Sequence, residues 1–81
     1  MLNADQVKEL INTFGLIATV TRNKVELAND VKAVIINKSF ITQFPLKAGD
    51  IIFAHNKSHK VLSVTSIADN LYFQGTYSDY V

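Results

Sequence analysis

The sequence predicts a mainly β fold of the α+β kind, with a short N-terminal helix followed by a small antiparallel β-barrel or sandwich. Short apolar, β-branched runs alternate with polar turns, and only the N-terminal stretch has the periodicity of a helix. A length of 81 residues corresponds to one domain. We therefore expect a single domain over residues 1–81, with the helix at about 3–14 and the barrel at about 16–78.

The N-terminal stretch carries the signals of an amphipathic helix. Asn3 is a suitable N-cap, and Gln6 occupies the capping-box position three residues later. Apolar residues with the spacing of one helix face follow, namely Val7, Leu10, Ile11 and Phe14. Gly15 comes next, where a helix commonly ends. We expect the whole stripe to pack on the sheet, and the alternative is an exposed stripe that binds a partner.

Two β runs follow the helix. Residues 16–21 alternate apolar residues with threonines, which is typical of a sheet with one solvated face, and residues 22–24 form a polar turn. Residues 25–27 either continue a strand or belong to a loop, because Asn29-Asp30 is expected to interrupt the chain. Residues 31–37 are the strongest strand, and their two partly apolar faces indicate a central position.

Residues 38–44 allow two interpretations. They are too polar for a buried strand and too apolar for an ordinary loop. Pro45 has no backbone donor and favours an extended conformation of Phe44. The segment is therefore either a short strand that ends before Pro45 or a mobile loop that becomes ordered on a partner.

The next stretch predicts a turn and a hairpin. Gly49 can adopt a positive φ and Asp50 can bond its own backbone, which indicates a turn over 46–50. Residues 51–54 and 59–64 then form two strands around a polar tip at 56–58. Regular alternation in the second strand places side chains in two pairs, Val61 with Ser63 and Leu62 with Val64.

The C-terminal part predicts a turn at 68–70 and an aromatic-rich strand at 71–77, after which residues 78–81 are expected to fray. Gly75 within this strand indicates a bulge or a close approach of another backbone. Residues 69–75 closely resemble the recognition tag of the tobacco etch virus protease, which begins with Glu where this chain has Asp69. Because the segment continues the strand pattern, we interpret it as native.

Composition argues against several classes of protein. The chain has no cysteine, so it can form neither a disulfide framework nor a thiolate metal site. Eight basic and seven acidic residues give a net charge of +1, which does not favour non-specific DNA binding. The N-terminus lacks the pattern of a signal peptide, and no apolar run is long enough for a membrane helix. We expect a soluble intracellular protein without membrane contact.

No arrangement of side chains indicates catalysis. His55 and His59 flank the hairpin tip and could approach each other, with Asp50 as a third ligand, but we expect two solvent-facing turn histidines instead. The serines lie in no nucleophile elbow and the glycines are isolated. We expect no enzyme, no metal and no cofactor. Aromatic residues on strands and basic residues at turns keep one alternative open, an OB- or SH3-like barrel that binds single-stranded nucleic acid or a peptide.

The order of the elements resembles the small head–tail joining proteins, also called head-completion or neck proteins, of lambda-like long-tailed bacteriophages and prophages. The matching stretches read GLIATVTR, VKAVIIN and FPLKAGDIIFAHNKSHKVLSV. The L-x-x-G-D turn of the family is matched by Leu46, Gly49 and Asp50. Its hairpin pattern is matched by His59, Val61 and Val64, with His59 where an aromatic residue is commoner. The helical arm and the loop before Pro45 are shorter than the family pattern.

The resemblance implies a structural virion-assembly protein of the head–tail connector, whose copies form a ring that joins the DNA-filled head to the tail. Its partners would be further copies, portal or adaptor proteins and tail proteins, with genome DNA only nearby, and an isolated subunit could be monomeric. It would be located in the virion and, during assembly, in the host cytoplasm. We expect contact residues in the 39–44 segment and at the hairpin tip, namely Phe40, Ile41, Phe44, Asn56, Lys57 and Lys60. The alternative for the three apolar residues is that they fill the core.

Overall fold

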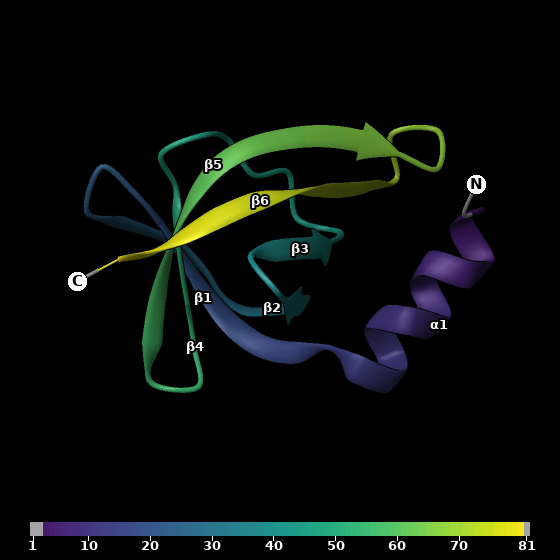
Figure 1. Ribbon diagram of the computed structural model, residues 1–81, viewed down its shortest axis with the longest axis horizontal. Helices are drawn as coiled ribbons and strands as arrows, with labels where there is room; N and C mark the ends of the chain where they lie inside the picture. Colours follow the sequence, from purple (N-terminus) through teal and green to yellow (C-terminus); the bar gives the residue numbers. More distant parts are fainter. Residues whose placement is uncertain (1–2, 81) are drawn as a thin grey trace.

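The computed structural model describes residues 3–80 and confirms the predicted fold class (Figure 1). One helix, α1 (Ala4–Phe14), precedes the strands β1 (Leu16–Arg22), β2 (Val25–Ile36), β3 (Ser39–Thr42), β4 (Ile51–Ala54), β5 (Lys57–Ile67) and β6 (Tyr72–Tyr80). The strands pair antiparallel and close into a barrel in the order β1-β2-β3-β6-β5-β4. In this circular order β2 lies across the barrel from β5, and β3 lies across from β4.

Helix α1 has the predicted boundaries. The Asn3 Oδ1 accepts a hydrogen bond from the Gln6 backbone N–H at 2.9 Å, and the Gln6 side chain accepts one from the Asn3 N–H at 3.0 Å. This pair of bonds completes the capping box. Gly15 ends the helix in an extended conformation, and a Cβ at this position would collide with the carbonyl oxygen of Ile11. Glycine is therefore required at position 15 by the close approach of the Ile11 carbonyl oxygen, and not by a left-handed backbone conformation.

The apolar stripe of α1 is only partly buried, so the expectation that all of it packs on the sheet is wrong. Val7 and Ile11 are buried against Val34 and Tyr72 on the outer surface of the barrel. Phe14, in the last turn, is 59% exposed because the apolar residues beneath the helix form a cluster that does not reach it.

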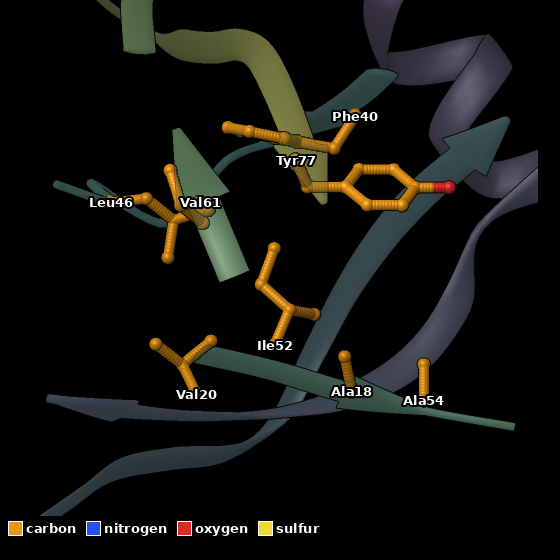
Figure 2. Packing of buried hydrophobic residues seen from close by; sticks show 8 residues of the cluster. All are labelled: Ala18, Val20, Phe40, Leu46, Ile52, Ala54, Val61 and Tyr77. Carbon is orange, nitrogen blue, oxygen red and sulfur yellow. The ribbon is translucent and has the colours of Figure 1, made fainter. Parts of the chain in front are cut away.

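The interior of the barrel is a single apolar core. Its buried residues come from five strands and the loop before β4, and Figure 2 shows them pointing toward one another: Ala18, Val20, Phe40, Leu46, Ile52, Ala54, Val61 and Tyr77. The partly buried Leu16, Val31, Ile35, Phe44 and Val64 pack against them. The core thus joins residues that are far apart in the sequence, as a closed barrel requires.

Asn29-Asp30 does not interrupt the chain, contrary to the prediction. Val25–Ile36 is one strand, and the polar pair lies where its pairing with β1 is irregular. Val20 faces Ala28 while Ala18 faces Val31, so β2 has an extra residue at this point. The polar pair Asn29-Asp30 therefore marks a β-bulge within the strand and not the end of a strand.

The segment after β2 is a strand, and the mobile-loop alternative is wrong. Asn37 and Lys38 form a tight turn with positive φ values of 50° and 69°, which returns the chain to pair as β3. β3 then pairs with β2 on one side and with β6 on the other. Phe40 is 1% exposed and belongs to the core, so the core-filling alternative holds for this residue.

The second strand of the central hairpin does not alternate as predicted. Val61 faces Tyr77 and Ser63 faces Thr76, which leaves Leu62 as an extra residue in β5. This bulge reverses the alternation, so that Val64, and not Ser63, packs against the core. The predicted close approach at Gly75 is confirmed, because a Cβ there would collide with the Ser63 carbonyl oxygen and the Phe40 ring.

Two boundaries near the end of the chain also differ from the prediction. The tip of the central hairpin is the pair His55-Asn56, with φ values of 51° and 61°, while Lys57 and Ser58 already belong to β5. β6 extends to Tyr80, which pairs with Ser58, so residues 78–80 are held in the sheet and residue 81 lies outside the described range. The tag-like segment contributes residues 72–75 to β6, and its native origin stays an interpretation.

Candidate interaction surfaces

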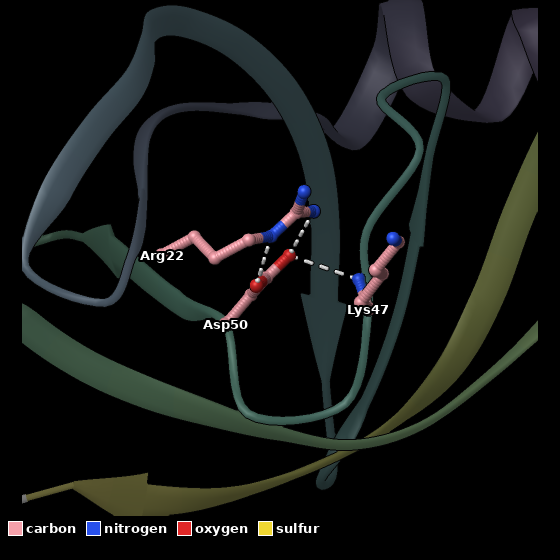
Figure 3. A network of polar contacts seen from close by, with 3 residues as sticks. All are labelled: Arg22, Lys47 and Asp50. Carbon is pink, nitrogen blue, oxygen red and sulfur yellow. Dashed lines mark hydrogen bonds and ion pairs between the residues drawn. The ribbon is translucent and has the colours of Figure 1, made fainter.

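A network of polar contacts surrounds Asp50, just before β4 and beside the end of β1 (Figure 3). The Arg22 guanidinium donates from Nε to Oδ1 and from Nη2 to Oδ2 of Asp50, both at 2.8 Å. The Lys47 backbone N–H donates to Oδ2 at 2.9 Å, and the Asp50 N–H donates to the Lys47 carbonyl at 3.0 Å. The turn has the predicted glycine, since Gly49 has a φ of 95°. This network fixes the loop before β4 to the end of β1.

The environment of Asp50 favours its ionised form. Burial alone would raise the pKa of this carboxyl group, but the Arg22 and Lys47 hydrogen bonds and their positive charges lower it further than burial raises it. The Asp50 hydrogen bond in turn raises the pKa of Arg22. With 1% of Asp50 exposed and both its oxygens engaged, this group is structural and is not available to a ligand.

His59 is buried, which corrects the expectation of two solvent-facing histidines. It faces Ile52, and its ring packs edge-to-face on Tyr77 with centroids 4.5 Å apart. Among residues 3–80 its Nδ1 has no hydrogen-bond partner, and the nearest carboxylate oxygen, Oδ1 of Asp79, is 3.8 Å away. Burial lowers the pKa of His59, Asp79 raises it, and Lys57 and Lys38 lower it. No cluster of three potential metal ligands occurs within residues 3–80.

One outer wall of the barrel carries exposed aromatic side chains, and we call it the aromatic face. Its residues lie side by side on four strands, in the order Thr19, Phe53, Ser58 and Tyr80. Phe53 is 46% exposed and Tyr80 is 51% exposed. They stand two strands apart, about 10 Å at ordinary strand spacing, with only the small Ser58 between them. Large exposed aromatic residues grouped on one wall are typical of a protein contact surface.

The opposite wall carries α1, and the outer side of this helix forms a second apolar surface, the α1 ridge. It consists of Leu10, Thr13 and Phe14, which line a shallow hollow with Gln6 and Glu9. Phe14 is more exposed than either aromatic residue of the aromatic face. In Figure 1 α1 lies beside the barrel and away from the β4–β5 hairpin, so the two apolar surfaces are separate.

A groove of about 780 Å³ runs between α1, β2 and the loop that follows β3. Its lining residues come from four segments: Lys8, Ile11 and Asn12 on α1; Ala28, Asp30, Val31 and Lys32 on β2; Thr42, Gln43, Phe44 and Pro45 at and after the end of β3; and Tyr72 of β6. The Thr42 hydroxyl donates to the Lys32 carbonyl at 2.9 Å and accepts from the Phe44 N–H at 3.3 Å. These bonds hold the loop against β2 and shape one side of the groove.

The predicted contact residues fall in four different places. Phe40 lies in the core, so it cannot contact a partner at the surface of the folded chain. Ile41 is half-buried beside α1, and Phe44 is half-buried at the groove. The hairpin residues Asn56, Lys57 and Lys60 are exposed next to the aromatic face, and their role as contacts stays a prediction.

Sequence reasoning missed the aromatic face and the groove. Phe53 alternates with the buried Ile52 and Ala54, and this period-two pattern could have placed it outside the barrel. Tyr80 lay in a segment that we expected to fray, and the groove depends on long-range packing.

No described helix is long and apolar enough to cross a membrane. No family model matches the chain, and the searches of curated proteins and of solved structures also give no match.

Proposed function

We propose that this protein is a structural assembly subunit that forms part of the head–tail connector of a lambda-like phage or prophage. It acts by binding proteins and not by catalysis. The observation that carries the proposal is the presence of two unlike apolar surfaces on opposite walls of a small closed barrel. The connector itself is supported only by the resemblance around Leu46, Gly49 and Asp50.

A ring of identical subunits needs this kind of arrangement. Each copy must offer one surface to the copy before it and a different surface to the copy after it, and the rotation between them must close. The aromatic face is a row of side chains on the sheet, whereas the α1 ridge is the outer side of a helix. In the proposed ring the aromatic face of one copy packs on the α1 ridge of the next, with Asn56, Lys57 and Lys60 at the rim.

Cysteine cross-linking tests the ring directly, because the chain has no cysteine of its own. Ser58→Cys labels the aromatic face, and Thr13→Cys labels the α1 ridge. The double variant, oxidised at high protein concentration, is expected to give a ladder of cross-linked species that ends at one closed size. Electron microscopy of that species should show a ring with an opening wide enough for double-stranded DNA.

The two single variants are the matched controls, and each should give no species larger than a dimer. Efficient dimers from Ser58→Cys alone would indicate a two-fold contact between identical faces and would contradict the ring. The absence of a ladder from the double variant, or an open-ended ladder without a closed species, would also contradict it.

A further inference from the structure

Within residues 3–80, no strand pairs with the edge of β2 that borders the groove. β2 pairs with β1 from Val25 to Ala33, but it pairs with β3 only from Ala33 to Ile36. Thr42 caps the Lys32 carbonyl on this edge, and none of the loop or turn backbone hydrogen bonds within residues 3–80 reaches residues 25–31. Unpaired backbone groups on an exposed edge can pair with another chain.

The groove lies directly beside this free edge and has the dimensions of a binding site. Its volume of about 780 Å³ falls within the usual range of ligand sites, about 300–1,000 Å³, which is room for a few amino-acid residues. Ile11, Phe44 and Tyr72 supply apolar and aromatic lining. A free strand edge with an apolar groove along it is the arrangement that binds extended peptides by strand addition.

The charges around the groove select the kind of peptide. Lys8 on α1 and Lys32 on β2 both line it, and among the described lining residues Asp30 is the only one with a carboxylate. The groove is therefore positive on balance, which favours a ligand with an acidic side chain. The bulges of β2 near Asn29 and Asp30 limit a regular ladder to a few residues, so the added strand should be short.

We propose that the groove binds a short extended segment of a partner protein, which adds as a strand to the free edge of β2. An apolar side chain of this segment packs between α1 and Phe44, and a carboxylate lies near Lys8 and Lys32. The inference goes beyond the ring and stands without it, because it uses neither the aromatic face nor the α1 ridge.

A display library of random seven-residue peptides, selected on the wild-type protein, is the first probe. We expect enriched peptides in which an acidic residue alternates with apolar or β-branched residues. Backbone NMR of the complex should show the largest shift changes at residues 28–32, Lys8 and Phe44. No enrichment, or enriched peptides that map to another surface, would overturn the inference.

Two changes then separate the backbone contact from the charge contact. N-methylation of alternate amides in the selected peptide removes ladder hydrogen bonds without altering the protein, and it should weaken binding about tenfold or more. The charge-reversed variant Lys8→Glu with Lys32→Glu should weaken binding about as much, whereas Lys57→Glu with Lys60→Glu, on the opposite wall, should leave it unchanged. Unchanged affinity after N-methylation, or equal loss in both variants, would contradict strand addition at this groove.

Discussion

Two buried polar side chains in this barrel, Asp50 and His59, have opposite surroundings. Asp50 accepts three hydrogen bonds, from Arg22 and Lys47, and its two oxygens are both engaged. His59 is similarly enclosed, but its Nδ1 has no partner within residues 3–80. A buried polar group that is fully bonded stabilises a unique structure, whereas an unbonded one costs free energy. The comparison predicts that the Asp50 corner, formed by Asp50 with Arg22 and Lys47, contributes more to stability than the His59 corner, formed by His59 with Tyr77 and Asp79.

The largest effect on the free energy of unfolding should come from removing the Asp50 carboxylate. Asp50→Ala leaves the part-buried Lys47 N–H without its acceptor and Arg22 without its partner, so we expect the free energy of unfolding to fall by about 3 kcal/mol. Urea denaturation measures this directly. Asp79→Ala is the matched control, because this exposed carboxylate should contribute about 0.5 kcal/mol or less. Equal losses of unfolding free energy in Asp50→Ala and Asp79→Ala would contradict the claim that the Asp50 corner contributes more to stability than the His59 corner.

The two corners should also respond to acid in different pH ranges. The folded pKa of His59 is lowered from 6.5, so the unfolded chain binds the proton first and stability falls as the pH drops below 6.5 toward the folded pKa. The folded pKa of Asp50 is lowered from 3.8, so its contribution is complete above 3.8 and is lost as the pH falls through the folded pKa. One proton changes stability by at most about 1.4 kcal/mol per pH unit.

Denaturation curves at a series of pH values can assign the loss of stability below pH 6.5, called the upper step, and the loss below pH 3.8, called the lower step. His59→Phe keeps an aromatic ring against Tyr77 and removes the unbonded nitrogen, so it should abolish the upper step and leave stability at neutral pH equal or higher. Asp50→Asn should abolish the lower step. An upper step that persists in His59→Phe would show that another group produces it.

The smallest effect should come from the charges around His59. Asp79 raises the pKa of His59 while Lys57 lowers it, so Asp79→Asn should lower this pKa further and Lys57→Gln should raise it. Loss of the exposed Lys38–Asp79 pair should cost only about 0.5 kcal/mol. An NMR titration of the His59 ring gives both pKa changes, and shifts of the same sign in the two variants would contradict this electrostatic assignment.

Local signals in the sequence were sufficient for the helix and for most of the strands. The capping box of Asn3 and Gln6, and the turn at Gly49, depend on residues that are close in sequence. The alternation of β4 was also readable, because Ile52 and Ala54 point inward and Phe53 outward. His59 stands two residues before the buried Val61, and this spacing could have indicated its burial.

The features that sequence reasoning missed depend on pairing between distant strands. The bulges at Asn29-Asp30 and at Leu62 exist only relative to the partner strand, and each changes which side chains face the core. Arg22 and Asp50 are 28 residues apart, so no local pattern relates them. The aromatic face and the groove likewise arise from barrel closure and from the packing of α1.

The central claim is that copies of this protein bind one another through two unlike surfaces on opposite walls. NMR spectra of the labelled protein over a range of concentrations test this claim most directly. We predict that amide shifts change together at the aromatic face, around Phe53 and Tyr80, and at the α1 ridge, around Thr13 and Phe14, while the groove residues stay unchanged. Changes confined to one of the two surfaces, or no change up to the solubility limit, would contradict the head-to-tail contact.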